Sequence, residues 1–391
     1  MKEDDIQMDT VTPVDLPAAA TPGSAQPGGA QPAAARPGRL RGFHPGWYGA
    51  VMGTAIVGII AYQNPGQLAG LAQSAQTVGV LMVALAAVLA VGLGIPYVAR
   101  WLRYPAAARA DLANPALGAL YATFPAGLLV LAVGIATVGP SVMEQETAAA
   151  LVALLAVVGI GLAVVVSVVF AAQLFLSPRV EPQVANGAWF IPPVVTIIAP
   201  MVLAPLAPYV APANLPLLVF AGYALWGMGF FLFVLVASLL FDRLVFHPLP
   251  PAPLAPSVWI GLGPLGVGGL ALLGIAKVGA PLWGDAAAVV GTLSSIAATA
   301  LWGFGLWWLA AAVVLLVAYR RRGPLPYGLG WWAFTFPLGA FTASTLALGR
   351  GWQASALEAM AVILFLALVV AWAVVSVSTL RAVASGAAWR R

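Results

Sequence analysis

A pair of features, an aromatic residue followed by a proline or glycine, recurs five times within the apolar part of this chain. The fullest copy is residues 331–337, Trp-Trp-Ala-Phe-Thr-Phe-Pro, which ends at Pro337. The other copies place the proline or glycine at Gly53, Pro125, Pro193 and Pro264, so successive copies are 72, 68, 71 and 73 residues apart. Such a near-constant period indicates a repeat architecture.

The composition places these repeats in a membrane. Hydrophobic residues make up 62% of the chain and charged residues only 7%, whereas about 25% of the residues of a soluble domain are charged. Each of the apolar segments is long enough to cross a bilayer as a helix. There are ten, at residues 46–64, 72–98, 115–138, 147–175, 187–207, 214–242, 256–277, 284–318, 327–348 and 354–381. We therefore predict an all-α polytopic membrane protein with ten transmembrane helices, arranged as five helical-hairpin repeats.

The two ends of the chain differ from this apolar region. Residues 1–42 are rich in proline and alanine and carry few large apolar side chains, so we expect a disordered cytoplasmic tail. The alternative is a regulatory arm. Residues 384–391 form a short basic C-terminus. The membrane domain is expected to comprise residues 43–383.

The positions of the basic residues predict the orientation. Fifteen of the 17 lysines and arginines precede the first apolar segment or follow an even-numbered one, and only Lys277 and Arg350 lie on the other side. Because basic residues favour the cytoplasmic side, both termini are expected in the cytoplasm of a multi-pass cell-membrane protein. The net charge of +5 therefore reflects topology, and no nucleic-acid partner is expected.

The odd-numbered segments hold the prolines and glycines of the repeat. Broken backbone at membrane depth is tolerated only where protein or a water-filled cavity satisfies its polar groups. We therefore expect the odd helices to form an inner ring with quasi-five-fold symmetry around a central pore. The even helices are expected to face lipid or neighbouring subunits.

Ionisable side chains are absent from the middle of the apolar segments, and the chain has no cysteine. Proton-coupled pumps usually carry an ionisable group at mid-membrane, and an intramembrane enzyme needs a cluster of polar catalytic groups. The sequence therefore favours a passive pathway without enzymatic activity, metal or cofactor.

The proposed breaks suggest how an uncharged pore attracts a solute. A proline that starts a new half-helix exposes a weakly positive N-terminal end, and such ends bind anionic substrates in transporters. The alternative is that the prolines only kink packed helices. The candidate positions are Gly53, Pro125, Pro192, Pro193, Pro264 and Pro337.

Two phenylalanines immediately precede these prolines. Phe124 and Phe336 occupy equivalent positions of the second and fifth repeats, and aromatic rings at the axis would close a narrow pore by excluding water. The alternative is ordinary packing. At the opposite end of the pore, Lys277 and Arg350 either form an electropositive vestibule or extend toward lipid headgroups.

Three further features are interpreted as structural. His44 and His247 lie at the predicted cytoplasmic border, where packing or helix capping is expected, with pH sensing as the alternative. The stretch 261–266, Gly-Leu-Gly-Pro-Leu-Gly, matches a dinucleotide-binding pattern. No strand precedes it, so its glycines are expected to allow close helix approach instead.

Two motifs resemble those of the tellurite-resistance/dicarboxylate transporter family, which includes malate permeases, sulfite efflux pumps and plant slow anion channels. They are residues 43–54, Phe-His-Pro-Gly-Trp-Tyr-Gly-Ala-Val-Met-Gly-Thr, and residues 331–339, Trp-Trp-Ala-Phe-Thr-Phe-Pro-Leu-Gly. The resemblance covers residues 43 to about 381. The chain departs from the repeat pattern at Gly53, where the first repeat lacks proline, and at the doubled Pro192-Pro193.

This resemblance implies a homotrimer in which each protomer has its own pore, closed by a phenylalanine on the ninth helix. By motif that residue is Phe336, with Phe334 as the alternative if the register differs. The leading hypothesis is a channel or permease for small anions such as malate or sulfite. The alternatives are a proton-linked carrier of the same acids or a tellurite-resistance-type permease, an intramembrane enzyme, and a sensor that uses the N-terminal tail as its output.

Overall fold

The computed structural model describes residues 38–177 and 180–389. The chain divides into Met1–Pro37 and a compact unit, Gly38–Arg391, so most of the predicted disordered tail lies outside the described residues. The compact unit begins before the predicted boundary at residue 43. Within it, the carbonyl of Arg41 accepts a hydrogen bond of 3.0 Å from Nε of Arg100. Residues 38–42 therefore lie within the compact unit, next to the boundary predicted at residue 43.

The described residues form eleven α-helices joined by 3-10 turns and loops, with no strand. Apart from the short α3 (Pro105–Leu112), the helices alternate between two kinds. The first kind, which we call the inner helices, comprises α1 (Gly49–Tyr62), α4 (Thr123–Val138), α6 (Ile191–Leu203), α8 (Leu262–Trp283) and α10 (Phe336–Gly351). The second kind, the outer helices, comprises α2 (Ala72–Arg103), α5 (Gln145–Leu176), α7 (Leu215–Phe246), α9 (Ala287–Arg322) and α11 (Ser355–Ala384).

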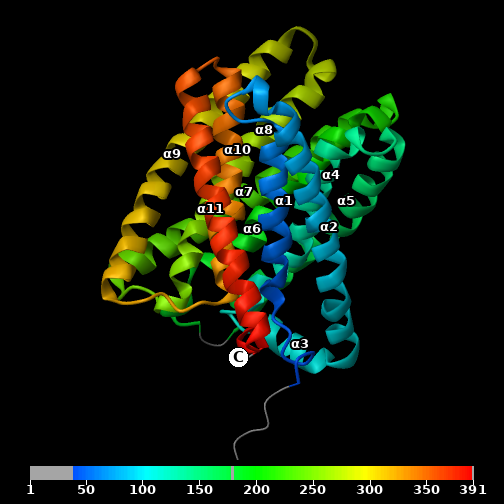
Figure 1. Cartoon of the computed structure of the whole chain (residues 1–391). Coiled ribbons are helices and arrows are strands. Elements are labelled where there is room, and N and C mark those ends of the chain that lie inside the picture. The colour runs from blue at the N-terminus through cyan, green and yellow to red at the C-terminus, as the bar shows by residue number, and fades with distance from the viewer. Residues whose placement is uncertain (1–37, 178–179, 390–391) are drawn as a thin grey trace, which may run out of the picture. The chain divides into compact units, whose positions relative to one another are not determined.

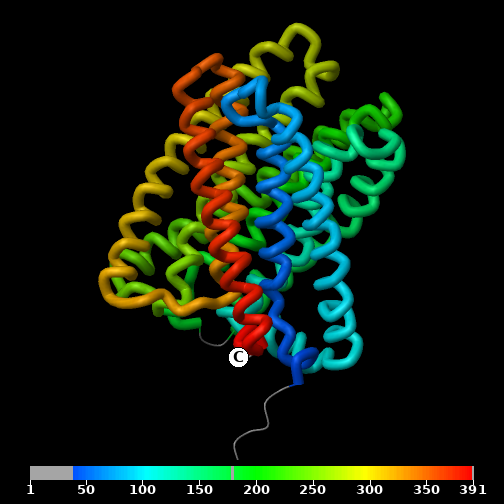
Figure 2. Tube along the Cα trace, in the orientation of Figure 1, coloured from blue at the N-terminus to red at the C-terminus, as the bar shows by residue number. Residues whose placement is uncertain are grey.

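Eight stretches of the described helices are long and apolar enough to cross a membrane. One of them, Ala252–Arg322, contains both α8 and α9, joined by a single 3-10 turn. Helix α10 has 16 residues and falls below the length of about 20 residues that a span needs on its own. The fold is thus that of an all-α polytopic membrane protein. In the compact unit, the first described residues and the C-terminus lie at the same end of the helices (Figures 1 and 2).

The inner helices contact one another in a closed sequence. Helix α1 packs against α4, α4 against α6, α6 against α8, α8 against α10, and α10 against α1. Each outer helix packs against its own inner partner and also against an inner helix of the adjacent pair, as α2 does against α4 and α11 against α1. The five hairpins therefore interlock around a ring of inner helices.

Burial follows the same division. Every residue from Ala50 to Ala61 in α1 is buried, and so are most of the residues of α6 and α8. The large apolar side chains that remain exposed lie mainly on the outer helices, and they include Val88, Val157, Phe231, Leu293 and Val370. An exposed apolar surface of this extent is stable in lipid rather than in water.

Side chains of the outer helices donate hydrogen bonds to inner helices of adjacent hairpins. Ser167 Oγ donates to the carbonyl of Pro192 at 2.7 Å, and Trp226 Nε1 donates to the carbonyl of Gly268 at 3.0 Å. Trp372 Nε1 donates to Thr54 Oγ1 at 3.1 Å and joins α11 to α1. Bonds of this kind in a membrane contribute about 0.6–2 kcal/mol each, so they stabilise contacts between hairpins in addition to packing.

Each inner helix is preceded by a 3-10 segment, and in the second to fifth repeats the α-helix begins next to the proline of the repeat. Pro337 is the second residue of α10, Pro192 is the second of α6, and Pro125 and Pro264 are the third residues of α4 and α8. Proline is favoured in the first turn because its missing N–H is not needed there. The 3-10 segments are η1 (Pro45–Tyr48), η3 (Gly118–Ala122), η6 (Gly187–Phe190), η9 (Ala252–Gly261) and η11 (Leu329–Phe334).

Glycines set how closely the inner helices approach. A Cβ atom added at Gly266 in α8 would lie 2.5 Å from the backbone carbonyl of Ala340 in α10. The prediction of close helix approach is therefore confirmed for Gly266. At Gly261 an added Cβ atom would lie 2.5 Å from the ring of Trp308 in α9, whereas at Gly263 it would meet only ordinary contacts at 3.5 Å or more. By contrast, a Cβ atom at Gly274 on the same helix meets nothing within 4 Å.

Gly266→Ala is expected to destabilise the protein by about 1–3 kcal/mol, because the new methyl group meets backbone that cannot move aside. Gly274→Ala is the matched control and should change the free energy of unfolding by less than about 0.5 kcal/mol. Chemical denaturation in detergent measures both. Equal stability of the two variants would show that the contact between α8 and α10 is looser than described.

Candidate functional site

A cavity of about 290 Å³ lies where the five inner helices begin. Its wall includes the first or second residue of every inner helix: Gly49, Thr123, Ile191, Gly263 and Phe336. All five 3-10 segments or the residues next to them also line it. The cavity is therefore built by the same part of each repeat.

We call the 3-10 segments η1, η3, η6, η9 and η11, together with the residues that lead into them, the entry segments. Polar side chains cap three of them. His44 Nδ1 accepts a hydrogen bond from the N–H of Gly46 at 3.0 Å, and Asn186 Oδ1 accepts one from the N–H of Ala188 at 2.9 Å. In the second repeat, Asn114 Oδ1 accepts one from the N–H of Ala116 at 2.8 Å. The role of His44 as a capping residue, which the sequence predicts, is confirmed.

Ser257 connects two repeats at the cavity wall. Its Oγ accepts a hydrogen bond from the N–H of Gly187 at 3.1 Å and donates one to the carbonyl of Leu254 at 2.7 Å. Positions 44, 114, 186 and 257 are 70, 72 and 71 residues apart. A polar residue thus recurs with the period of the repeat, and this pattern in the sequence could have predicted these four side chains as part of the site.

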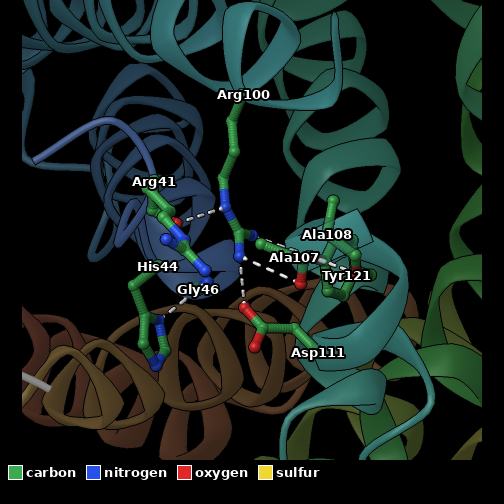
Figure 3. Close-up of polar contacts among 8 residues, drawn as sticks. All are labelled: Arg41, His44, Gly46, Arg100, Ala107, Ala108, Asp111 and Tyr121. Carbon is green, nitrogen blue, oxygen red and sulfur yellow. Dashed lines mark hydrogen bonds and ion pairs between the residues drawn. The ribbon is translucent and has the colours of Figure 1, made fainter. Parts of the chain in front are cut away.

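A buried arginine holds the first two entry segments together (Figure 3). Besides its bond to Arg41, Arg100 donates from Nη1 to Tyr121 Oη at 2.8 Å and forms an ion pair with Asp111 at 2.5 Å. Tyr121 Oη in turn donates to the carbonyl of Ala108 at 3.0 Å. The guanidinium group therefore joins the end of α2 to the chain before η1 and to α3 and η3.

Arg243 acts in the same way in the third and fourth repeats. It donates from Nε to the carbonyl of Gln183 at 3.2 Å and from Nη1 to the carbonyl of Pro248. Arg100 and Arg243 are each the fourth-last residue of a 32-residue outer helix, and both are buried. The positive-inside rule identifies both arginines only as topology signals, although they lie 143 residues, or two repeats, apart.

The cavity is uncharged. His44 is the only residue with a titratable side chain among the described residues that line it. Five helical segments point their N-terminal ends toward this space, and each helix carries a partial positive charge at that end. The first N–H groups of α1 and α4 already donate to carbonyls of the preceding 3-10 segments. The positive electrostatic potential therefore belongs to the N-terminus of the 3-10 segment and its α-helix taken together. This arrangement attracts an anion without a fixed counter-charge.

Phe336, the first residue of α10, is a buried part of the cavity wall. Its side chain is 4% exposed and lines the cavity together with Met52, Val194 and Gly263. A Cβ atom added at Gly263 would lie 3.8 Å from the Phe336 ring and 3.5 Å from Val194. The Phe336 ring therefore lies beside the start of α8, the inner helix that packs directly against its own α10.

Phe124 and Phe334 lie elsewhere. Phe124 stacks on Tyr97 with a centroid distance of 4.4 Å and contacts Tyr48 edge-on at 4.6 Å. Phe334 contacts Trp259 edge-on at 5.4 Å. Neither lines the cavity; each lines a groove between outer helices instead. Their positions therefore do not support the predicted gate role, because a side chain directed at the outer helices cannot close the axis.

The residues at the predicted breaks are distributed unevenly around the cavity. Pro337 lines it, whereas Pro125, Pro192, Pro193 and Pro264 are buried beside it without being part of its wall. Gly53 is not at a break but is the fifth residue of α1.

The buried glycine at position 53 has a packing function. A Cβ atom at Gly53 would lie 2.2 Å from Thr335 Oγ1 and 2.8 Å from the ring of Trp332. The glycine therefore allows the fifth repeat to pack against α1. In the first repeat, the change of backbone from 3-10 to α occurs at Gly49 instead.

The predicted outer vestibule is not assembled as expected. Arg350 donates to the carbonyl of Gln63 at 2.8 Å and forms an ion pair with Glu358 at 3.2 Å. Oε1 of Glu358 also accepts the N–H of Gly66 at 2.9 Å. Arg350 thus joins the first repeat to the fifth, while Lys277 is exposed on α8. Neither residue lines the cavity.

Comparison with known proteins identifies the family. Residues 42–380 match the family described as voltage-dependent anion channel. The chain belongs to this family. The match to the voltage-dependent anion channel family includes all inner helices, the whole cavity wall and, apart from Arg41, the network of Arg100. The resemblance inferred from the motifs at residues 43–54 and 331–339 is confirmed.

Individual relatives are named as transporters. The chain is 31% identical to an uncharacterised transporter of Methanocaldococcus jannaschii, over 89% of this chain and 95% of the relative. It is 30% identical to a sulfite efflux pump of Trichophyton rubrum, over 79% and 82% of the two chains. It is 24% identical to a malic acid transport protein of Schizosaccharomyces pombe, over 85% and 77%. Members of the voltage-dependent anion channel family thus transport anions, and the protein is a multi-pass membrane protein.

Arg100→Ala is expected to lower the free energy of unfolding by about 3–5 kcal/mol, because it removes the ion pair with Asp111 and the hydrogen bonds to Arg41, Tyr121 and Ala107. Arg103→Ala is the control, since Arg103 lies on the same helix but is exposed. Thermal unfolding in detergent compares the two variants. If both variants unfold like the wild type, the network of Figure 3 does not hold the entry segments in place.

Proposed function

We propose that this protein conducts small anions across the cell membrane through the cavity and past Phe336. The observation that carries the proposal is the convergence of five helix N-termini on an uncharged cavity that ends at an aromatic side chain. The names of the relatives support C4-dicarboxylates such as malate, or sulfite, as the substrate class. A neutral pathway binds anions weakly enough to release them.

The proposal includes the topology of each chain. All ten long helices cross the membrane, with α8 and α9 as separate crossings and the shorter inner helices extended by their 3-10 segments. The closed order of contacts among the inner helices supports quasi-five-fold symmetry. An even number of crossings, with arginines after α2, α7, α9 and α11, supports cytoplasmic termini. By the family resemblance, three such chains assemble as a homotrimer, each with its own pore.

Phe336 is the proposed gate. In this proposal its ring narrows the pathway beside the start of α8, and an apolar constriction of this kind opposes the passage of a hydrated anion. Movement of the ring away from Gly263 would connect the cavity with the far side. A Cβ atom added at Gly263 would lie 3.8 Å from the ring, an ordinary contact distance, so α8 leaves space beside the ring.

Phe336→Ala is expected to raise anion flux by about tenfold or more, the change that corresponds to a barrier lowered by about 1.4 kcal/mol. Flux is measured as current in planar bilayers with malate, sulfite, nitrate and chloride gradients imposed in turn at equal pH. Phe334→Ala is the matched control, because it removes the same side chain two residues away without opening the cavity. A folded Phe336→Ala protein that conducts no better than the control would contradict the gate.

A proton-linked carrier of the same acids is the second candidate, because one relative is named as an efflux pump. Among the described residues, His44 is the only one with a titratable side chain in the cavity wall. Its substitution therefore tests whether the protein carries the proton. His44→Asn preserves the cap, since asparagine performs it at Asn114 and Asn186, but removes the titrating group. A passive pathway predicts unchanged flux and pH dependence. If the pH gradient drives uptake in the wild type and this drive is lost in His44→Asn, a proton-linked carrier is correct.

A further inference from the structure

A second hollow lies on the outer side of the fifth repeat. This groove, of about 350 Å³, runs between α9 and α11. Its floor is formed by Trp259, Trp331 and Phe334, and Ala371 and Val374 of α11 line one side. We call it the α9/α11 groove. It is separate from the cavity that leads to Phe336, because Trp259, Trp331 and Phe334 do not line that cavity.

One charged residue lines the otherwise apolar groove. Arg320 of α9 lies in its wall, and Arg321 and Arg322 end the same helix. All three side chains are exposed. Within residues 38–177 and 180–389, the ion pairs are Arg100–Asp111 and Arg350–Glu358, so no described carboxylate neutralises this triplet.

We propose that the α9/α11 groove binds an anionic phospholipid, with an acyl chain between α9 and α11 and the phosphate at Arg320–Arg322. The outer helices on both sides expose apolar side chains such as Val314 and Val370, so the groove opens toward the acyl region of the bilayer. Arginines at the end of a membrane helix lie at headgroup level, where each one attracts an anionic lipid by about a fivefold gain in affinity. The apolar floor and the charged rim thus match the two parts of one molecule.

A second groove provides an internal comparison. It lies between α2 and α5, has a volume of about 370 Å³, and is lined by Tyr97, Trp101 and Phe124. Val165 of α5 also lines it, but no arginine or lysine does. This α2/α5 groove has a similar size and apolar floor, so an acyl chain fits either groove. Only the α9/α11 groove is expected to distinguish an anionic headgroup from a zwitterionic one.

The test counts lipids that remain bound to the full-length protein in native mass spectrometry after incubation with dioleoyl phosphatidylglycerol or dioleoyl phosphatidylcholine. Each wild-type chain should retain one more molecule of phosphatidylglycerol than of phosphatidylcholine. Arg320→Gln should reduce this retention about fivefold, and Ala371→Trp should abolish it by filling the groove. Val165→Trp fills the other groove and Arg103→Gln removes an exposed arginine elsewhere; both should retain the lipid.

Each other outcome overturns the proposal. Equal retention of the two lipids by the wild type would mean that no headgroup site exists. Loss of the lipid in all four variants would mean diffuse attraction to the surface. An Ala371→Trp protein that changes its oligomeric mass without losing lipid would show that a second copy of the chain covers the groove. Lipid retention does not depend on flux, so failure of this site and failure of the proposed gate are distinguishable.

Discussion

The structure depends on the need of backbone polar groups for partners in an apolar surrounding. A helix that crosses a membrane satisfies its own N–H and C=O groups, whereas a break in it exposes several of them. This protein places five such breaks at one end of its inner helices and supplies partners for them. His44, Asn186 and Ser257 bond to the entry segments, and Arg100 and Arg243 bond to the carbonyls of the adjoining loops. The breaks can therefore remain open to a cavity without unfolding the helices that follow.

The same constraint explains why the cavity is uncharged. The part of its wall that the structure describes includes no carboxylate, lysine or arginine. His44, Thr123, Asn186 and Ser257 bond to the entry segments, whereas the buried indole N–H of Trp332 has no partner among the described residues. The attraction for an anion therefore comes mainly from the helix ends. Under the proposed mechanism such an attraction is diffuse and does not by itself distinguish one small anion from another. In the proposed function, selection and control then fall to the narrow part of the axis, where Phe336 lies against Gly263.

Local features of the sequence predicted much of this arrangement. The period of the breaks and the length of the apolar segments predicted the alternation of inner and outer helices, because both depend on short stretches of chain. Side-chain direction was harder to predict. Phe124, Phe334 and Phe336 all lie next to the same kind of break, yet a shift of one or two residues around a helix directs a ring to the axis or to the outer helices.

The structural roles of the charged residues were also hard to predict from the sequence. The positive-inside rule treats every arginine as a topology signal, and it does not distinguish the exposed Arg103 from the buried Arg100. That distinction depends on α3 and its Asp111, which pair with Arg100 only once the chain has folded. Arg350 was likewise expected to face a vestibule or lipid, but it binds the carbonyl of Gln63, 287 positions away in the chain.

The most direct test of the central claim, that anions pass through the cavity of each chain, uses the absence of cysteine from the sequence. A single Leu254→Cys substitution places one thiol in the cavity wall, and Val165→Cys places one in the α2/α5 groove as a control. Anion flux is measured before and after reaction with a charged methanethiosulfonate reagent. Our account predicts that modification of Leu254→Cys blocks flux, that malate or sulfite slows this modification, and that modified Val165→Cys conducts like the wild type. Complete modification of Leu254→Cys with unchanged flux would contradict the account, because the anions would then cross by another route.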